Sequence, residues 1–244
     1  MMNLKKKIVV GVASAALIAS MGVTPAFADK GVNTHDTGNK VVFPDGGSFT
    51  RLSGDSRFDT AMAVAEQTYK DSGKKLKVAY LVSSSDDSMV DAATSGMLKD
   101  GVVLLVSDNK AQQLLLGASI KEKFPTVSKL VAVGGTAVVS DDAIANVKKM
   151  DSKVTTTDRL GGKDRYETNV AVAKAVFKKG DGINRVYFTR GDLIVDALTA
   201  GAVANGPVLL VRPTGDVSEA TKDYYQGLPT TRMSDVIIGG DKAL

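Results

Sequence analysis

Short unbroken apolar runs alternate along this chain with longer amphipathic stretches. The apolar runs cover 78–82, 102–106 and 130–133. Runs without polar alternation are typical of strands covered on both faces, as in a parallel sheet. Helices are predicted by the stretches at 59–73, 90–98, 111–124 and 140–150. Because helices that join parallel strands build βαβ units, the pattern predicts the α/β fold class.

The same pattern occurs twice. The stretch RLSGDSRFDT at 51–60 matches RLGGKDRYET at 159–168 at an offset of 108 residues, and after a deletion of three residues the offset is 105. In the second register GVVLLV at 101–106 matches GPVLLV at 206–211. So many matches in one order indicate a duplication. We therefore predict two tandem Rossmann-like or flavodoxin-like modules, over residues 51–158 and 159–244.

The second repeat is shorter than the first. Its third strand, predicted at 236–238, precedes only six residues, so it has no counterpart of the helix predicted at 140–150. An apolar strand face without that helix is uncovered. We expect either that the sequence continues in the natural protein or that another subunit covers this face.

Residues 1–28 have the features of a secretory signal peptide. Three lysines, Lys5 to Lys7, precede an apolar run of about 16 residues, and Ala-Phe-Ala at 26–28 gives a cleavage pattern. An uncleaved anchor is the alternative, although the run is short for a bilayer span. Residues 29–50 are rich in Gly, Asn, Thr and Asp and read as a linker. We expect a secreted protein, without stable membrane insertion after cleavage.

Composition excludes several classes of site. The chain has no cysteine, which excludes disulfides, a cysteine nucleophile and thiolate metal ligands, and its single histidine, His35, lies in the linker. The formal net charge of +4 comes largely from the leader. Without the three lysines of the leader, 28 of the 31 basic residues remain, against 27 acidic residues, which gives a net charge of +1. The whole-protein charge thus gives no support for binding nucleic acid.

Four polar positions persist in both repeats. They are the pairs Arg51/Arg159, Arg57/Arg165, Thr60/Thr168 and Asp91/Asp196. Arginine suits bidentate contacts with carboxylate or phosphate, so the arginines are candidate ligands for an anionic polymer. The alternative is structural, with each arginine paired to an aspartate such as Asp91 or Asp196.

Two glycine pairs follow predicted strands, Gly134-Gly135 and Gly239-Gly240. Free N–H groups at such turns can bind phosphate or carboxylate. Tight strand-to-helix turns also use glycine for its backbone freedom, so a structural role is the alternative.

Enzyme signatures are sparse. No GxSxG elbow, GxGxxG fingerprint or GxxxxGK[ST] loop occurs. The acidic residues Asp86, Asp87 and Asp91 allow a carboxylate cluster for acid–base work or a divalent cation, but the second repeat keeps only Asp192 and Asp196 there. A solvated loop is the simpler interpretation. We expect no catalytic residue, no metal and no cofactor.

With these motifs the chain resembles the type 2 cell-wall-binding repeat family of Gram-positive surface proteins. The resemblance rests on RLSGDSRFDTA at 51–61, RLGGKDRYETN at 159–169, DALTAG at 196–201, GPVLLV at 206–211 and VGGTAVVS at 133–140. It implies parallel α/β modules that attach non-covalently to anionic secondary wall polymers, such as teichoic acids or similar glycans. It also implies three modules about a pseudo-threefold axis, often beside a hydrolase or adhesin domain.

The chain departs from that pattern in having fewer than two full modules, no attached effector domain, and SSSDDSMVDAATSG in place of a Gly-rich loop. The missing module suggests either a truncated product or self-association that completes the arrangement of three modules. We expect an exported, non-catalytic wall-binding protein. The alternatives are a wall-associated hydrolase of the amidase type, or a modifier of one, and an extracellular binder of small molecules.

Overall fold

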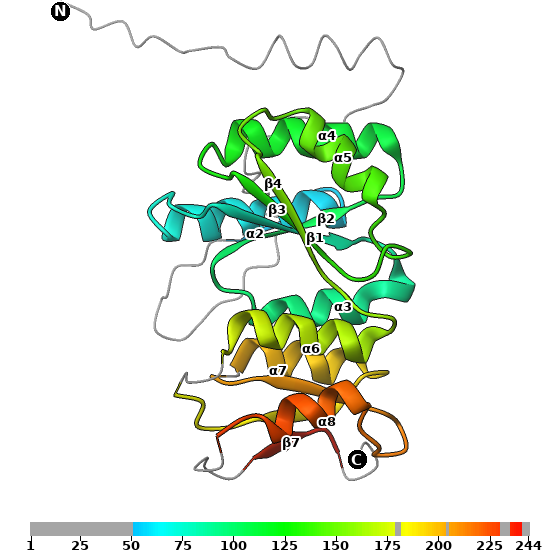
Figure 1. The fold of residues 1–244 in the computed structure, drawn as a ribbon. Coiled ribbons are helices and arrows are strands. Elements are labelled where there is room, and N and C mark those ends of the chain that lie inside the picture. The colour runs from blue at the N-terminus through cyan, green and yellow to red at the C-terminus, as the bar shows by residue number, and fades with distance from the viewer. Residues whose placement is uncertain (1–50, 179–181, 204, 230–234, 241–244) are drawn as a thin grey trace, which may run out of the picture.

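The computed structural model describes residues 51–178, 182–203, 205–229 and 235–240. The predicted signal peptide and linker lie outside these residues. Two parallel sheets, each with helices around it, are stacked one above the other (Figure 1). The predicted α/β class is therefore confirmed.

The first sheet has the strand order β2-β1-β3-β4, all parallel. This is the order 2-1-3-4 of flavodoxin-like folds. Its elements are α2 (Arg57–Asp71), β1 (Val78–Ser83), η1 (Asp86–Ser88), α3 (Met89–Thr94), η2 (Ser95–Met97), β2 (Gly101–Val106), α4 (Lys110–Lys123), β3 (Lys129–Val133), α5 (Asp141–Lys149) and β4 (Thr156–Leu160).

The second sheet has the order β6-β5-β7, again parallel. Its elements are α6 (Arg165–Val176), β5 (Tyr187–Arg190), α7 (Ile194–Val203), β6 (Val208–Val211), α8 (Glu219–Gln226) and β7 (Val236–Ile238). Tyr80 of β1 and Tyr187 of β5 are equivalent, because they pair with Val103 and Val208 and their hydroxyls donate to Asp100 and Asn205. The duplication thus extends to single side-chain contacts.

Strand β4 crosses the predicted boundary between residues 158 and 159. It contains Arg159 and Leu160 of the second repeat, yet it pairs with β3 and completes the first sheet. Its position is held by an ion pair of 2.9 Å between Lys129 of β3 and Asp158. The start of one repeat therefore supplies an edge strand to the module before it.

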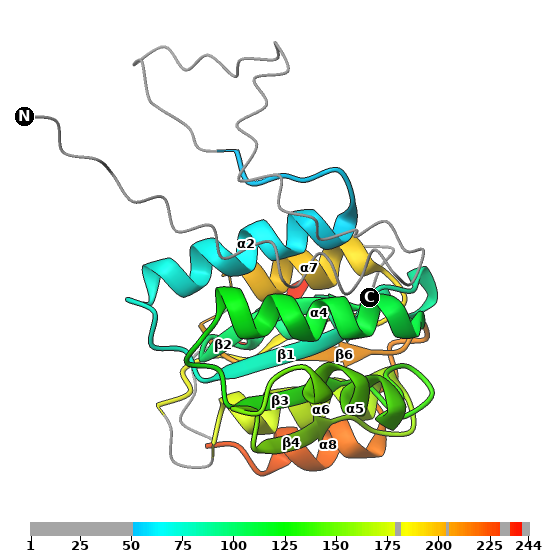
Figure 2. The ribbon, with the colours of Figure 1, turned by 90° about the horizontal axis from the view of Figure 1, so that it is seen from above.

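The first sheet separates two apolar layers. On one face α2, α4 and α5 pack on alternate residues of the strands, among them Leu81, Leu104 and Leu130. These helices lie over the sheet in Figure 2. On the other face, strand residues such as Val82 and Val133 belong to a cluster that continues into α6 and the second sheet. Helix α6 lies against α3 and η2, so the two modules share one core across their junction.

The second sheet is less completely covered than the first. Ile237 of β7 is exposed, whereas Ala132, at the equivalent position of β3, is fully buried beneath the helices. The expected uncovered face at the predicted strand 236–238 is confirmed.

Candidate functional site

Arg57 and Arg165 have the same structural role in the two modules. Each donates from Nη1 to a backbone carbonyl just after the first strand of its own sheet, Arg57 to Ser84 at 2.9 Å and Arg165 to Gly191 at 3.0 Å. Arg57 also forms an exposed ion pair of 2.6 Å with Asp86. The repeated arginine therefore fixes the loop at the carboxyl end of the strand.

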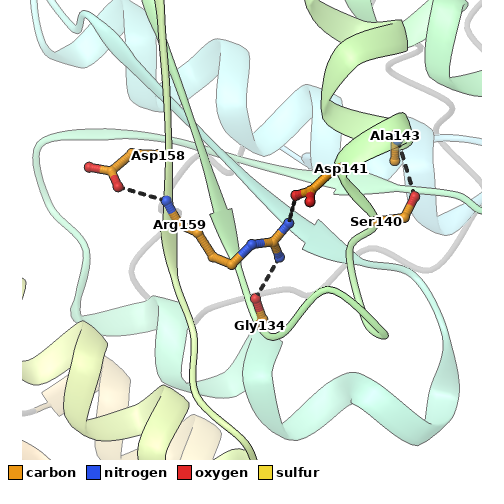
Figure 3. Close-up of polar contacts among 6 residues, drawn as sticks. All are labelled: Gly134, Ser140, Asp141, Ala143, Asp158 and Arg159. Carbon is orange, nitrogen blue, oxygen red and sulfur yellow. Dashed lines mark hydrogen bonds and ion pairs between the residues drawn. The ribbon is translucent and has the colours of Figure 1, made fainter.

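Arg159 joins β4 to the loop that follows β3 (Figure 3). Its Nη1 donates to the carbonyl of Gly134 at 2.8 Å, and its Nη2 donates to Asp141 Oδ1 at 2.7 Å. The side chain is only 22% exposed. Its repeat counterpart, Arg51, is exposed and has no side-chain partner among residues 51–178, 182–203, 205–229 and 235–240.

The pair Arg159 and Arg51 gives a matched test of structural roles. We expect Arg159→Ala to lower the free energy of unfolding by about 2 to 3 kcal/mol, because two hydrogen bonds of a charged donor are lost and the Gly134 carbonyl loses its partner. We expect Arg51→Ala to change it by less than about 0.5 kcal/mol. Urea unfolding followed by circular dichroism measures both values. Equal effects would contradict the different roles.

The glycine pairs occupy turns that need an unusual backbone. Gly134 and Gly239, the first residue of each pair, have φ angles of 114° and 148°, a region that disfavours other residues. After Gly134, the N–H groups of residues 135–137 donate to no acceptor within the described part of the chain. The turn thus has both a structural need for glycine and free donors.

A crevice of about 320 Å³ opens between the modules at this turn. It is lined by η1 and α3, by the loop after β3, and by the loop after β4 together with the start of α6. The chain passes from β1 to β2 on one side of the sheet and from β3 to β4 on the other, so the strand order reverses between β1 and β3. Ligands of open α/β sheets bind at such switch points. The lining residues are Asp87, Ser88, Val90, Asp91, 135–138, 162–165 and Thr168.

Asp91 is the buried acid of the crevice. The residue is 6% exposed, and its Oδ1 is buried with no hydrogen-bond partner. Burial raises the pKa of this carboxyl to about 6; the positive charge of Arg165 opposes the shift and the negative charge of Asp164 adds to it. Asp196, its repeat counterpart, is half-buried.

The crevice brings together some of the predicted site residues and leaves others out. Asp91, Gly135 and Arg165 line it; Arg51, Arg57 and Arg159 do not. Lys163 also lines it, a residue that comparison of the repeats could not identify because its counterpart is Asp55. The Lys163 ammonium has no partner among the residues that the structure describes.

Within the described ranges, no group of three or more His, Asp or Glu side chains is placed to hold a metal ion. Asp86 is paired with Arg57, and Asp87 faces the crevice. None of the described helices has the length and apolar character needed to cross a membrane.

Comparison with known proteins places this fold in a family context. The family model described as "Cell wall binding domain 2 (CWB2)" matches residues 51–144 and 159–244. "N-acetylmuramoyl-L-alanine amidase LytC" of Bacillus subtilis is 27% identical over 198 residues, which are 79% of this chain. The match covers 36% of that relative, so this chain spans about a third of its length.

Two solved structures share the fold. "Cwp6 from Clostridium difficile" has a TM-score of 0.63 at 23% identity, and "Cwp8 from Clostridium difficile" has a TM-score of 0.57 at 24% identity. Each match covers 79% of this chain, together with 29% of the Cwp6 chain and 31% of the Cwp8 chain.

Proposed function

Since this chain belongs to the cell wall binding domain 2 family, we propose that it is an exported, non-catalytic protein that attaches to an anionic secondary polymer of the cell wall. The attachment is non-covalent and needs no cofactor. The observation that carries the proposal is the crevice between the modules, which is lined by an unpaired lysine and by three residues whose N–H groups have no acceptor among the described residues.

The sequence suggested polymer contact for all four repeated arginines. We assign that contact to the residues that line the crevice instead. Arg57 and Arg159 are engaged with backbone carbonyls and acidic side chains of the fold, which supports a positioning role for both. Lys163 and Arg165 line the crevice. Exposed Arg51 and the turn at Gly239-Gly240 remain secondary candidates for polymer contact.

Lys163→Glu tests the proposal. We expect the substitution to reduce retention on purified cell walls at least about tenfold, because it places a negative charge where the polymer anion binds. Lys153→Glu is the matched control, since it makes the same charge change on an exposed residue outside the crevice. Cosedimentation with walls, before and after the anionic polymers are stripped, measures retention.

Salt gives a second readout of that experiment. We expect wild-type retention to fall between low and high salt, because charged contacts at the surface are screened. Retention that is unaffected by salt, by stripping and by Lys163→Glu would contradict the proposal. Cleared zones on a wall zymogram would instead support an amidase-type hydrolase, the alternative that the relative's name suggests.

We also propose that a second copy of the chain covers the outer face of α7. Val195 and Leu198 are 73% and 53% exposed there, whereas their repeat counterparts, Val90 and Ala93 of α3, are 4% and 1% exposed. The α3 residues are covered because α3 packs against α6 and α7 of the next module. The second module repeats the same surface, and nothing among the described residues covers it.

Introducing negative charge on the outer face of α7 tests the proposed self-association. We expect the wild-type protein to sediment faster than a monomer at high concentration, and Val195→Asp combined with Leu198→Asp to return it to a monomer. Both side chains are exposed, so the fold is expected to remain intact. Sedimentation velocity over a range of concentrations measures the change. A wild-type monomer at every concentration would disprove self-association without affecting wall binding.

A further inference from the structure

The buried carboxylate of Asp91 gives the crevice an acceptor as well as its cationic donors. Asp91 Oδ1 has no hydrogen-bond donor from the protein, although Arg165 is close enough to lower the pKa of the carboxyl. The Arg165 guanidinium instead donates to the Gly191 carbonyl. A buried acceptor without a donor is unfavourable, so a ligand that brings a donor to this carboxylate gains binding free energy.

The other acidic groups of the crevice weaken the attraction of its two cationic side chains for an anion. Asp164 Oδ1 already accepts from the N–H groups of Tyr166 and Glu167 as the cap of α6, and Asp87 is exposed at the opening. Lys163 and Arg165 supply two positive charges, and the three carboxyls of Asp87, Asp91 and Asp164 offset them. This balance favours an anionic group attached to a sugar-like group with hydroxyl donors over an inorganic anion, which offers charge alone.

The size and lining of the crevice limit the size and chemistry of the ligand that it can bind. Its volume of about 320 Å³ lies near the lower end of the roughly 300–1,000 Å³ range of small-molecule sites. No aromatic side chain lines it, so a sugar ring would be held by hydrogen bonds and charge rather than by stacking. One sugar ring with one anionic substituent matches both properties.

We propose that the crevice binds a single sugar unit bearing a phosphate or carboxylate, with a ring hydroxyl donating to Asp91 and the anion lying between Lys163 and the N–H groups of residues 135–137. This inference rests on the proposed wall attachment and names the chemical unit that the same site recognises. It assigns Asp91 a binding role, in place of the ion pair with arginine that the sequence also allowed.

Titration of the mature chain with N-acetylglucosamine 1-phosphate tests the inference. Inorganic phosphate and N-acetylglucosamine serve as the two half-ligands, and amide chemical shifts report where each binds. We expect the sugar phosphate to bind at least about tenfold more tightly than either half-ligand, with shifts centred on Gly135, Thr136 and Lys163. Equal binding of inorganic phosphate would mean that the crevice recognises the anion alone, and would overturn the inference.

Asp91→Asn and Lys163→Met separate the two contacts. We expect each to weaken binding of the sugar phosphate about tenfold, and only Lys163→Met to weaken binding of inorganic phosphate. Asp151→Asn is the matched control, because Asp151 is also buried with an unpartnered carboxylate oxygen but lies outside the crevice. Lys163 is exposed, so its variant tests the site even if the buried substitution perturbs the fold.

Two further results would also overturn the inference: unchanged affinity of Asp91→Asn, or shifts confined to another face. Neither would affect the wall attachment, which is measured separately by cosedimentation. Wall retention lost only after polymer stripping, together with no binding of the sugar phosphate in the crevice, would show that the polymer is held elsewhere on the protein.

Discussion

Asn169→Ala is expected to destabilise this protein by about 3 to 5 kcal/mol, the largest loss of stability that we expect from a single substitution. Asn169 is fully buried in α6, and its side chain bridges the backbone of β6. Its Nδ2 donates to the Val208 carbonyl at 2.9 Å, and its Oδ1 accepts from the Leu210 N–H at 3.0 Å. The amide therefore takes the place of a neighbouring strand at the free edge of β6.

The magnitude follows from the two backbone groups that Asn169→Ala leaves without a partner. Each buried unsatisfied group costs about 1 to 3 kcal/mol, and loss of the side-chain volume adds to the sum. Guanidinium unfolding measures the change in midpoint, and Asn184→Ala, at an exposed position, is the control. A loss below about 1 kcal/mol would show that water satisfies the β6 edge.

The second large effect is a dependence of stability on pH through Asp91. The folded protein raises the pKa of this carboxyl from about 4 to about 6, mainly by burial. The folded state therefore binds the proton more tightly than the unfolded state. The stabilisation is full below about pH 4 and is lost as the pH rises through 6, a difference of up to about 3 kcal/mol.

Asp91→Asn removes this titration. We expect the variant to gain stability relative to wild type at pH 8 and to gain little or none at pH 4, because the wild-type carboxyl is already neutral there. Chemical unfolding at pH 4, 5, 6, 7 and 8 gives the two profiles. Parallel profiles for the variant and the wild type would show that Asp91 does not titrate in this range.

The sequence was sufficient for most of the fold because its strands are unbroken apolar runs. The runs at 78–82, 102–106 and 130–133 are strands of one parallel sheet, as predicted. Strand β4 could not be predicted in this way, since its residues Thr-Thr-Asp-Arg-Leu are mostly exposed and carry no apolar pattern. It is a strand because β3 offers an edge and because Arg159 and Lys129 hold it there.

The candidate site was only partly predictable, because comparison of repeats selects residues needed by both copies. Arg57 and Arg165 persist since each module needs its first loop fixed, and Gly134 and Gly239 persist since both turns need a positive φ. Lys163 differs from its counterpart Asp55, so a comparison of the two repeats could not select it as a site residue. The crevice itself forms only where two modules meet, and periodicity within one repeat has no information about that junction.

The position of β4 also separates the repeating unit from the folding unit. A cut between residues 158 and 159 would divide this strand, expose the edge of β3 and remove the guanidinium that holds the Gly134 turn. It would also uncover the apolar layer that α6 shares with the first sheet. The duplicated segment is therefore a unit of gene duplication rather than an excisable domain, and the two modules are expected to unfold in one cooperative transition.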